Sequence, residues 1–398
     1  MTPARRPRPR PPAPAPDPAG PAGLTQVDFL QTQVDFLHGP VATAPTQGAH
    51  PVISCASQAC RWFTAEPASN HRLQSCARPD SFRASRMKQI GMAPDIWDAM
   101  SRPRQIIPGS TLLLTRRTSQ RQFLLRPCRM VNQVFEYCLA YAARKYSIQV
   151  HAWCVMSNHY HLVVTDPNGK VPAFMSWFNE FLAKALNAFY GRWENFFAPG
   201  SYSMVRLEDS ETVLDKIVYT LVNPVRAGLV SRSAYWPGST SLRVGFQGRL
   251  SVARPRNFFR TKGPTPERVE MTLTPPPGFE GDVAEFERKL LEQVRKREQE
   301  IRAEAKAEHR KFLGRKAALG VNPTDAPKTR EPRRNRNPWV AARDKETRQA
   351  AMARLRDFWR EYRECWLAFT AGDHSVVFPF GTYQMRLYAL AVCTSPPS

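Results

Sequence analysis

The sequence predicts an α+β protein whose central part has a ferredoxin-like fold, with strands and helices in the order βαββαβ. Between about residues 110 and 225, short apolar runs typical of strands alternate with longer segments of helical spacing. Their order is that of the split βαβ unit. The flanking regions differ in composition, which predicts a disordered N-terminal segment and a basic, largely helical C-terminal extension.

The first half of the predicted domain contains three strands and one helix. The apolar run at 111–115 predicts a strand, followed by a polar segment over 116–121. A helix is expected over 128–145, where apolar residues recur at spacings of three and four. Residues 150–156 and 159–165 then predict two strands that form a tight hairpin around Ser157 and Asn158.

The second half contains two helices and one strand. The phenylalanines and tryptophan of 174–190 predict a helix that packs on the core, and 203–207 predicts a strand. A second helix is expected over 211–222, capped by residues 208–210. We expect this helix to end there because the residue before Pro224 avoids the α conformation.

The flanking regions are predicted to lie outside this domain. Residues 1–100 form a Pro/Ala-rich segment without periodicity, and we expect translation to begin near Met87 or Met92. Residues 244–280 are expected to be a linker, and residues 281–398 a basic extension. Within that extension, 282–316 predicts a charged helix with a thin apolar stripe, resembling a solvated arm, and 347–368 predicts another helix. The apolar residues after Phe378 must pack on something.

The overall charge is strongly positive. The formal net charge is +23 and the isoelectric point is near 10.1, which favours a polyanionic partner such as nucleic acid. A ribosome-associated or merely solubilising basic surface explains the charge equally well.

The cysteines form no CxxC pair, which argues against structural zinc and fits a reducing compartment. Without an apolar run of about 18 residues or a secretory signal, we expect a cytoplasmic, nucleoid-associated protein with no membrane partner.

Two short motifs are candidates for chemistry. His159 and His161 are two residues apart on a predicted strand, so their imidazoles project from one face as a pair of metal ligands. Tyr219 and Asn223 are four residues apart on a helix and share a face. Taken singly, each residue also has a plainer interpretation. The two histidines could be hydrogen-bonded strand residues, and Tyr219 could be a core tyrosine. Asn223, which precedes a proline, could simply mark the end of a helix.

The order of these motifs closely resembles the single-tyrosine HUH transposases, the insertion-sequence-200-like family, and in particular its REP-associated tyrosine transposase branch. The matching segments are 157–163, the aromatic helix, 219–230 and 234–241, within a domain placed at 105–243. The sequence departs from many relatives at Ser157 and at the bulky Tyr160, whose side chain strand alternation directs away from the histidines.

The resemblance implies roles for individual residues. Tyr219 corresponds to the nucleophile that attacks single-stranded DNA and becomes joined to the 5′-phosphate. His159, His161 and Asn223 correspond to the ligands of a divalent ion, Mg²⁺ or Mn²⁺. We expect single-stranded or hairpin DNA as substrate, a homodimer, and no small-molecule cofactor. The candidate DNA contacts are Arg116, Arg117, Arg121 and Arg226.

The sequence therefore predicts a bacterial transposase that cleaves and rejoins single-stranded DNA with metal assistance. One alternative is a nicking replication or transfer initiator, although no GxxxxGK[ST] loop accompanies the motifs. The other is a domesticated, non-catalytic DNA-binding protein, which the charge would serve equally well.

Overall fold

The computed structural model describes residues 102–200, 202–256, 264–279, 281–328 and 338–396. The predicted disorder of residues 1–100 lies outside the described residues. Gly109–Arg343 forms one compact unit. Asp344–Ser398, with the described residues before Gly109, belongs to a second unit, which we describe separately.

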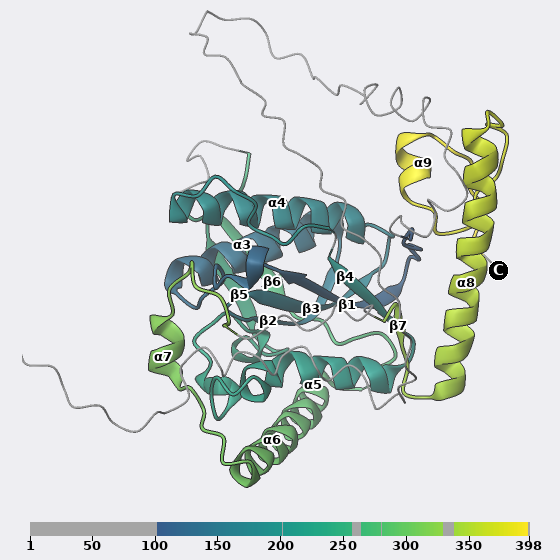
Figure 1. The fold of residues 1–398 in the computed structure, drawn as a ribbon. Helices are drawn as coiled ribbons and strands as arrows, with labels where there is room; N and C mark the ends of the chain where they lie inside the picture. Colours follow the sequence, from purple (N-terminus) through teal and green to yellow (C-terminus); the bar gives the residue numbers. More distant parts are fainter. Residues whose placement is uncertain (1–101, 201, 257–263, 280, 329–337, 397–398) are drawn as a thin grey trace, which may run out of the picture. The chain divides into compact units, whose positions relative to one another are not determined.

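A five-stranded sheet forms the centre of the first unit (Figure 1). Its strands lie in the order β2-β3-β1-β4-β7; the first four are antiparallel, and β7 pairs parallel to β4. This confirms the predicted ferredoxin-like βαββαβ fold. The elements are β1 (Ser110–Arg117), η2 (Ser119–Arg121), α3 (Arg129–Tyr146), β2 (Gln149–Val155), β3 (His159–Asp166), α4 (Val171–Tyr190), β4 (Ser203–Leu207), α5 (Ser210–Arg226), η3 (Ser233–Tyr235), η4 (Ser241–Arg243) and β7 (Val340–Ala341).

Helices cover both faces of the sheet. Figure 1 shows α3 and α4 on one face and α5 on the other. On the α3–α4 face, the fully buried Tyr160 packs edge-on against Phe135 and Phe178. Its hydroxyl donates to Asn179 Oδ1 at 2.6 Å. Strand alternation therefore directs Tyr160 into the helical layer opposite to α5, as predicted.

Local interactions explain where the helices begin and end. The carboxylate of Asp166 accepts hydrogen bonds from the backbone N–H groups of Lys170 and Val171, which fixes the start of α4. The extended Asp209 caps α5 by accepting from the Thr212 N–H at 2.6 Å. This confirms the expected cap within 208–210.

The prediction that the second helix ends at residue 222 is wrong. Helix α5 continues through Pro224 to Arg226. Its end is a Schellman motif, in which Gly228 has φ 68° and its N–H donates to the Val225 carbonyl, while the Leu229 N–H donates to the Pro224 carbonyl. A proline so near the C-terminus removes few helical hydrogen bonds, and burial of this turn compensates for the loss. Asn223 is consequently a helical residue.

The first strand is longer than predicted and includes part of the polar segment expected over 116–121. Arg116 and Arg117 belong to β1, which pairs with β3 as far as His159. The strand extends because hydrogen bonding to β3 outweighs the polar composition of its end. The chain then turns at Gln120 and Arg121, which both have positive φ.

Residues 244–280, expected to be a linker, contain a two-stranded sheet of β5 (Arg249–Ala253) and β6 (Arg268–Thr272). The predicted helix over 282–316 is shorter: α6 (Val283–Ala307) ends at Ala307, and a separate α7 (Arg315–Gly320) follows. Both lie in the first compact unit. The extent of the transposase-like domain itself stays a prediction.

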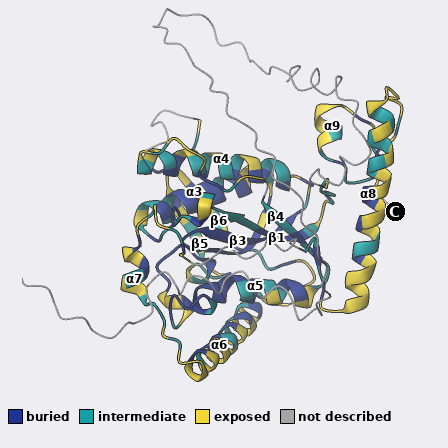
Figure 2. Ribbon diagram, in the orientation of Figure 1, coloured by how far each residue is buried: buried dark blue, intermediate teal, exposed yellow. Residues whose placement is uncertain are grey.

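Helix α6 is not a solvated arm. It contacts α5, and the members of its apolar stripe, Phe286, Leu290, Val294 and Ile301, are all buried. Figure 2 shows exposed residues along its other side. The thin stripe suffices because it packs on a helix that is itself fixed to the sheet.

The second unit contains α8 (Lys345–Thr370) and α9 (Gln384–Tyr388). Phe378 is fully buried and contacts Tyr362 and Phe369 of α8. The expectation that the apolar residues after Phe378 pack is wrong for Leu387, Leu390 and Val392, which are exposed. Tyr388 remains 83% exposed. None of the helices in the described ranges is both long and apolar enough to cross a membrane.

A buried histidine joins β2, β3 and the chain after β6. His151 lies at an irregularity of the β2–β3 pairing. Its Nδ1 lies 2.6 Å from the Thr274 carbonyl and its Nε2 lies 2.8 Å from Thr165 Oγ1. Since a carbonyl only accepts, Nδ1 carries the proton and Nε2 accepts from Thr165. Burial lowers the pKa of His151 to about 4.

We expect acidification to destabilise the first unit through this residue. Between pH 6.5 and 4 the imidazole is protonated in the unfolded chain but stays neutral in the folded one. The free energy of unfolding should therefore be about 2 kcal/mol lower at pH 5 than at pH 7. Other buried histidines act in the same direction. Denaturant unfolding at pH 7 and at pH 5 measures this effect. Between the two pH values, His151→Gln should lose less free energy of unfolding than the original chain. An equal loss would contradict a neutral, buried His151.

Truncating the α6 stripe should destabilise the first unit. Leu290→Ala removes a buried side chain and leaves a cavity, so the free energy of unfolding should fall by about 2–5 kcal/mol. Arg295→Ala on the exposed side of the same helix is the control and should change it by about 0.5 kcal/mol or less. Chemical denaturation measures both. Equal effects of the two variants would mean that α6 does not pack on α5.

Candidate functional site

Strand β3 places His159 and His161 on the face of the sheet that α5 covers. The two rings lie side by side with centroids 4.9 Å apart and planes nearly perpendicular. Both residues are buried, at 8% and 6% exposure. Two imidazoles that bind one ion through nitrogen at about 2.1 Å place their ring centroids at roughly this separation. The predicted pairing of the histidines is therefore present in the structure.

Hydrogen bonds orient both rings. His159 Nδ1 lies 2.7 Å from Asn158 Oδ1, and His161 Nδ1 lies 2.8 Å from Thr115 Oγ1. The Asn158 amide nitrogen donates to the Arg121 carbonyl, so its oxygen faces His159 and accepts from Nδ1–H. The lone pair of His159 is then on Nε2. In both rings, Nδ1 is engaged and Nε2 is the nitrogen left for a ligand.

Burial keeps both imidazoles neutral at pH 7. It lowers the pKa of His161 to about 4, with a further contribution from the nearby Lys216 charge. Burial also holds the pKa of His159 well below its usual range, and the charges of His161 and Arg117 act in the same direction. Neutral imidazole is the form that binds metal ions.

Helix α5 brings Tyr219 to the same place. The Tyr219 ring centroid lies 5.4 Å from that of His161, although 58 positions separate the two in the chain. Burial raises the pKa of the Tyr219 phenol. The Arg226 charge and a hydrogen bond with the buried Asn223 side chain oppose that rise. The structure therefore brings together His159, His161, Tyr219 and Asn223, which we call the His–Tyr cluster.

Two cations flank the phenol. The Arg226 guanidinium carbon lies 5.4 Å from the Tyr219 ring centroid, and the Lys216 ammonium lies 5.7 Å from it. Both positions follow from α5, because residues three before and seven after Tyr219 share its helix face. Positive charge at this point suits an anionic phosphodiester.

The four arginines predicted to contact DNA fall into two groups. Arg117 lies directly across from His159 in the sheet, and Arg226 lies beside Tyr219. Arg116 points to the α3–α4 face, where it donates to the Gly200 carbonyl and lies over Phe197. The side chain of Arg121 is buried. The structure thus gathers Arg117 and Arg226 around the His–Tyr cluster, but not Arg116 and Arg121.

The sequence prediction missed three residues of this site. Asn158 looked like a turn residue, but it also orients His159. Thr115 is recognisable only once the β1–β3 register places it across from His161. Lys216 could have been found from the sequence, because a position three residues before Tyr219 lies on the same helix face.

The donors of the cluster suit a divalent ion. Two neutral imidazoles and the amide oxygen of Asn223 would tolerate Mn²⁺, and Mg²⁺ less well. In the part of the chain that the structure describes, no group of three or more His, Cys, Asp or Glu side chains could hold a metal ion. An ion here would therefore need Asn223 or the substrate to complete its ligands.

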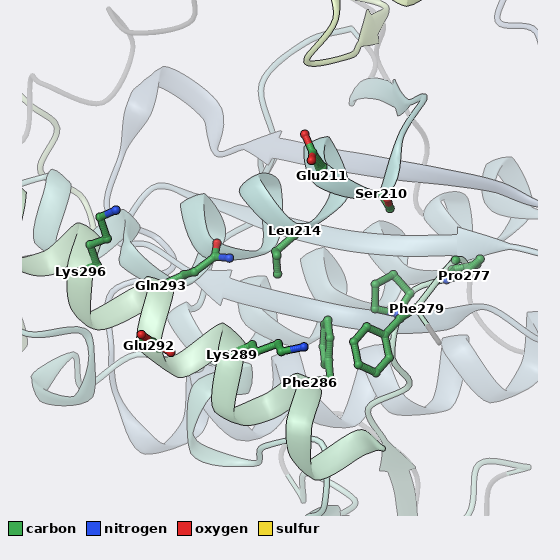
Figure 3. Close-up of a pocket in the computed structure, with 12 residues that line it drawn as sticks. Ser210, Glu211, Leu214, Pro277, Phe279, Phe286, Lys289, Glu292, Gln293 and Lys296 are labelled. Carbon is green, nitrogen blue, oxygen red and sulfur yellow. The ribbon is translucent and has the colours of Figure 1, made fainter. Parts of the chain in front are cut away.

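A separate pocket lies at the start of α5 (Figure 3). It is formed by the first turn of α5, the segment before residue 280 and the first half of α6, including Leu214, Phe279 and Phe286. None of its lining residues belongs to the His–Tyr cluster.

Comparison with known proteins agrees with this geometry. Residues 114–216 match the family model described as "Transposase IS200 like". The central segment therefore resembles the IS200-like transposases. This confirms the predicted resemblance, over about a quarter of the chain. The matched range contains both histidines and ends three residues before Tyr219.

Solved structures of transposases also resemble the chain. One described as "Structure of the REP associates tyrosine transposase bound to a REP hairpin" is 20% identical, covering 43% of this chain and 98% of that one, with a TM-score of 0.32. A putative transposase from Deinococcus radiodurans is 19% identical over 31% and 97% of the two chains, with a TM-score of 0.23. The tRNA(His) guanylyltransferase of Saccharomyces cerevisiae is 11% identical over 34% and 67%, with a TM-score of 0.27. No curated protein is significantly similar to this chain.

The orienting role of Asn158 can be measured as metal affinity. Asn158→Ala frees the His159 ring to rotate or change tautomer, so we expect Mn²⁺ binding to weaken about 10- to 100-fold. Calorimetric or spin-resonance titration with Mn²⁺ measures it. Asn168→Ala, in an exposed turn, is the matched control and should bind Mn²⁺ normally. Unchanged affinity in Asn158→Ala would rule out the orienting role.

Proposed function

We propose that this protein is a DNA transposase that cleaves and rejoins single-stranded DNA through a 5′-phosphotyrosine intermediate. The observation that carries the proposal is the position of Tyr219. Its ring lies 5.4 Å from His161, in a cluster flanked by Arg117, Lys216 and Arg226. The match of residues 114–216 to the IS200-like transposases supports the same reaction class.

In the proposed reaction the Tyr219 hydroxyl oxygen attacks the phosphorus of a phosphodiester. The bond from phosphorus to the 3′-oxygen breaks, the phenolic proton is released, and the leaving 3′-oxygen takes up a proton. The product is a DNA 5′-phosphate joined to Tyr219. Attack by another 3′-hydroxyl reverses the step and joins strands without ATP, because the phosphotyrosine retains the ester.

The residues around Tyr219 have complementary roles. Arg226 favours the phenolate, and Arg226 and Lys216 attract the phosphate, while the hydrogen bond with Asn223 holds the phenol in place. At neutral pH only about one phenol in a thousand with an ordinary pKa near 10 is ionised, so such assistance matters. Arg117, across from His159, adds positive charge on the strand side of the cluster.

His159, His161 and Asn223 would hold the divalent ion, Mg²⁺ or Mn²⁺. When bound, such an ion polarises a phosphoryl oxygen and is worth several kcal/mol of transition-state stabilisation. Asn158 and Thr115 keep the two Nε2 atoms available for it.

The proposed partner is single-stranded or hairpin DNA, and the proposed assembly is a homodimer in the nucleoid. The net charge of +23 supports the DNA partner, because neutralising phosphates releases counterions at any sequence. A DNA-binding protein without catalytic activity would share this charge. Only formation of the covalent adduct separates the two functions.

The test uses the full chain, Mn²⁺ and a labelled hairpin with single-stranded flanks. We expect a covalent adduct that resists denaturing electrophoresis and is absent in Tyr219→Phe. The matched control is Tyr160→Phe, which removes a buried hydroxyl on the opposite face of β3 from the histidines and should still form the adduct. His159→Ala should slow adduct formation at least about 100-fold. An adduct in Tyr219→Phe would exclude this nucleophile, and a full rate in His159→Ala would exclude the metal site.

A further inference from the structure

The loop after α4 exposes a tryptophan almost completely. Trp193 is 98% exposed. Tryptophan has a large apolar surface and is highly buried on average. The fold of the first unit therefore does not account for an indole at this position.

The backbone around Trp193 is held in place. Gly191, with φ 63°, ends α4, and the Arg192 N–H donates to the Asn187 carbonyl at 2.9 Å. The Asn187 amide nitrogen then donates to the Glu194 carbonyl at 2.8 Å. Hydrogen bonds thus fix the residues on both sides of Trp193. The indole is presented from an ordered turn, which reduces the entropy that a ligand would have to remove.

The same loop is attached to the sheet beside the His–Tyr cluster. The Ser119 N–H donates to the Phe196 carbonyl, and the Ala198 N–H donates to the Arg117 carbonyl. Phe196 is buried and anchors the loop there. Arg117 is the residue across from His159. The loop that carries Trp193 is therefore tied to the end of β1 that lies across from His159.

The chemistry of the loop favours an unpaired nucleobase as ligand. Arg192 and the exposed Glu194 flank Trp193 with opposite charges, so the indole itself is the feature that a ligand would use. Protein sites for single-stranded nucleic acid use such exposed aromatic rings, because every base has a face that can stack on one. In a duplex those faces are covered by neighbouring base pairs.

We propose that Trp193 stacks on an unpaired base of the DNA strand that is bound at the His–Tyr cluster. The inference rests on the proposed function and specifies how the strand is held next to the reacting phosphate. Trp193 is a positioning residue, because it contacts the substrate at a base and not at the phosphate that reacts.

The experiment measures binding in a Tyr219→Phe background, so that no covalent adduct forms. The ligand is a fluorescent hairpin with a single-stranded flank, and a fully paired duplex of the same length is the comparison. Trp193→Ala should weaken binding of the flanked hairpin about 10-fold, and Trp193→Phe, which keeps a ring, should stay within about threefold of the parent. Both should bind the duplex like the parent. Tyr388→Ala, which removes an aromatic side chain of similar exposure from α9, is the matched control and should change nothing.

Abasic substitutions, made one at a time along the flank, identify the stacked base. At one position the abasic site should weaken binding by the parent about 10-fold, yet have little further effect in Trp193→Ala. Equal affinity of parent and Trp193→Ala for the flanked hairpin, or equal sensitivity to every abasic position, would overturn the inference. If the original chain still forms the adduct, the proposed function survives that result. If the parent binds no single-stranded DNA at all, both fall together.

Discussion

The site depends on one geometric constraint, which is the alternation of side chains along β3 between two helical layers. His159 and His161 point to α5, while Tyr160 between them points to α3 and α4 and packs there with Phe135 and Phe178. A shift of the strand by one residue would exchange the two sets, turning Tyr160 toward α5 and the histidines toward α3 and α4. The buried aromatic packing of Tyr160 therefore fixes the register that faces the imidazoles toward Tyr219.

Placing two buried imidazoles beside a partly buried phenol is unfavourable unless their polar atoms are satisfied. Asn158 and Thr115 supply hydrogen bonds to the Nδ1 atoms, and Asn223 supplies one to Tyr219. Burial then becomes useful, because it keeps the histidines neutral. The charges of Arg117 and Lys216 reinforce this effect on His159 and His161 respectively. Together with Arg226 beside Tyr219, they leave the cluster attractive to an anion. The same buried setting thus favours binding of a metal ion by the histidines and binding of a phosphate by the cations.

The position of α5 is secured from its outer side. The apolar stripe of α6 is buried where that helix contacts α5. The buried Glu298 of α6 also accepts a hydrogen bond from the Ser233 N–H at 2.6 Å, which ties α6 to the chain just after α5. A nucleophile that must reach a phosphate held by another element benefits from such support, since small displacements of reacting groups are costly. Residues after 243 therefore contribute to the unit that contains the site.

The sequence by itself determined the order of elements, the pairing of His159 with His161 and the shared helix face of Tyr219 and Asn223. These are local properties, because strand and helix periods relate residues only a few positions apart. It could not determine that α5 passes through Pro224, since the preference of the residue before proline yields to burial and to the Schellman motif at Gly228. Nor could it show that the thin stripe of α6 is a core face. Only the tertiary structure decided that Thr115 lies across from His161 and that Tyr219 reaches the histidines. The physical reason is that both contacts depend on sheet register and on packing between layers, which bring together residues far apart in the chain.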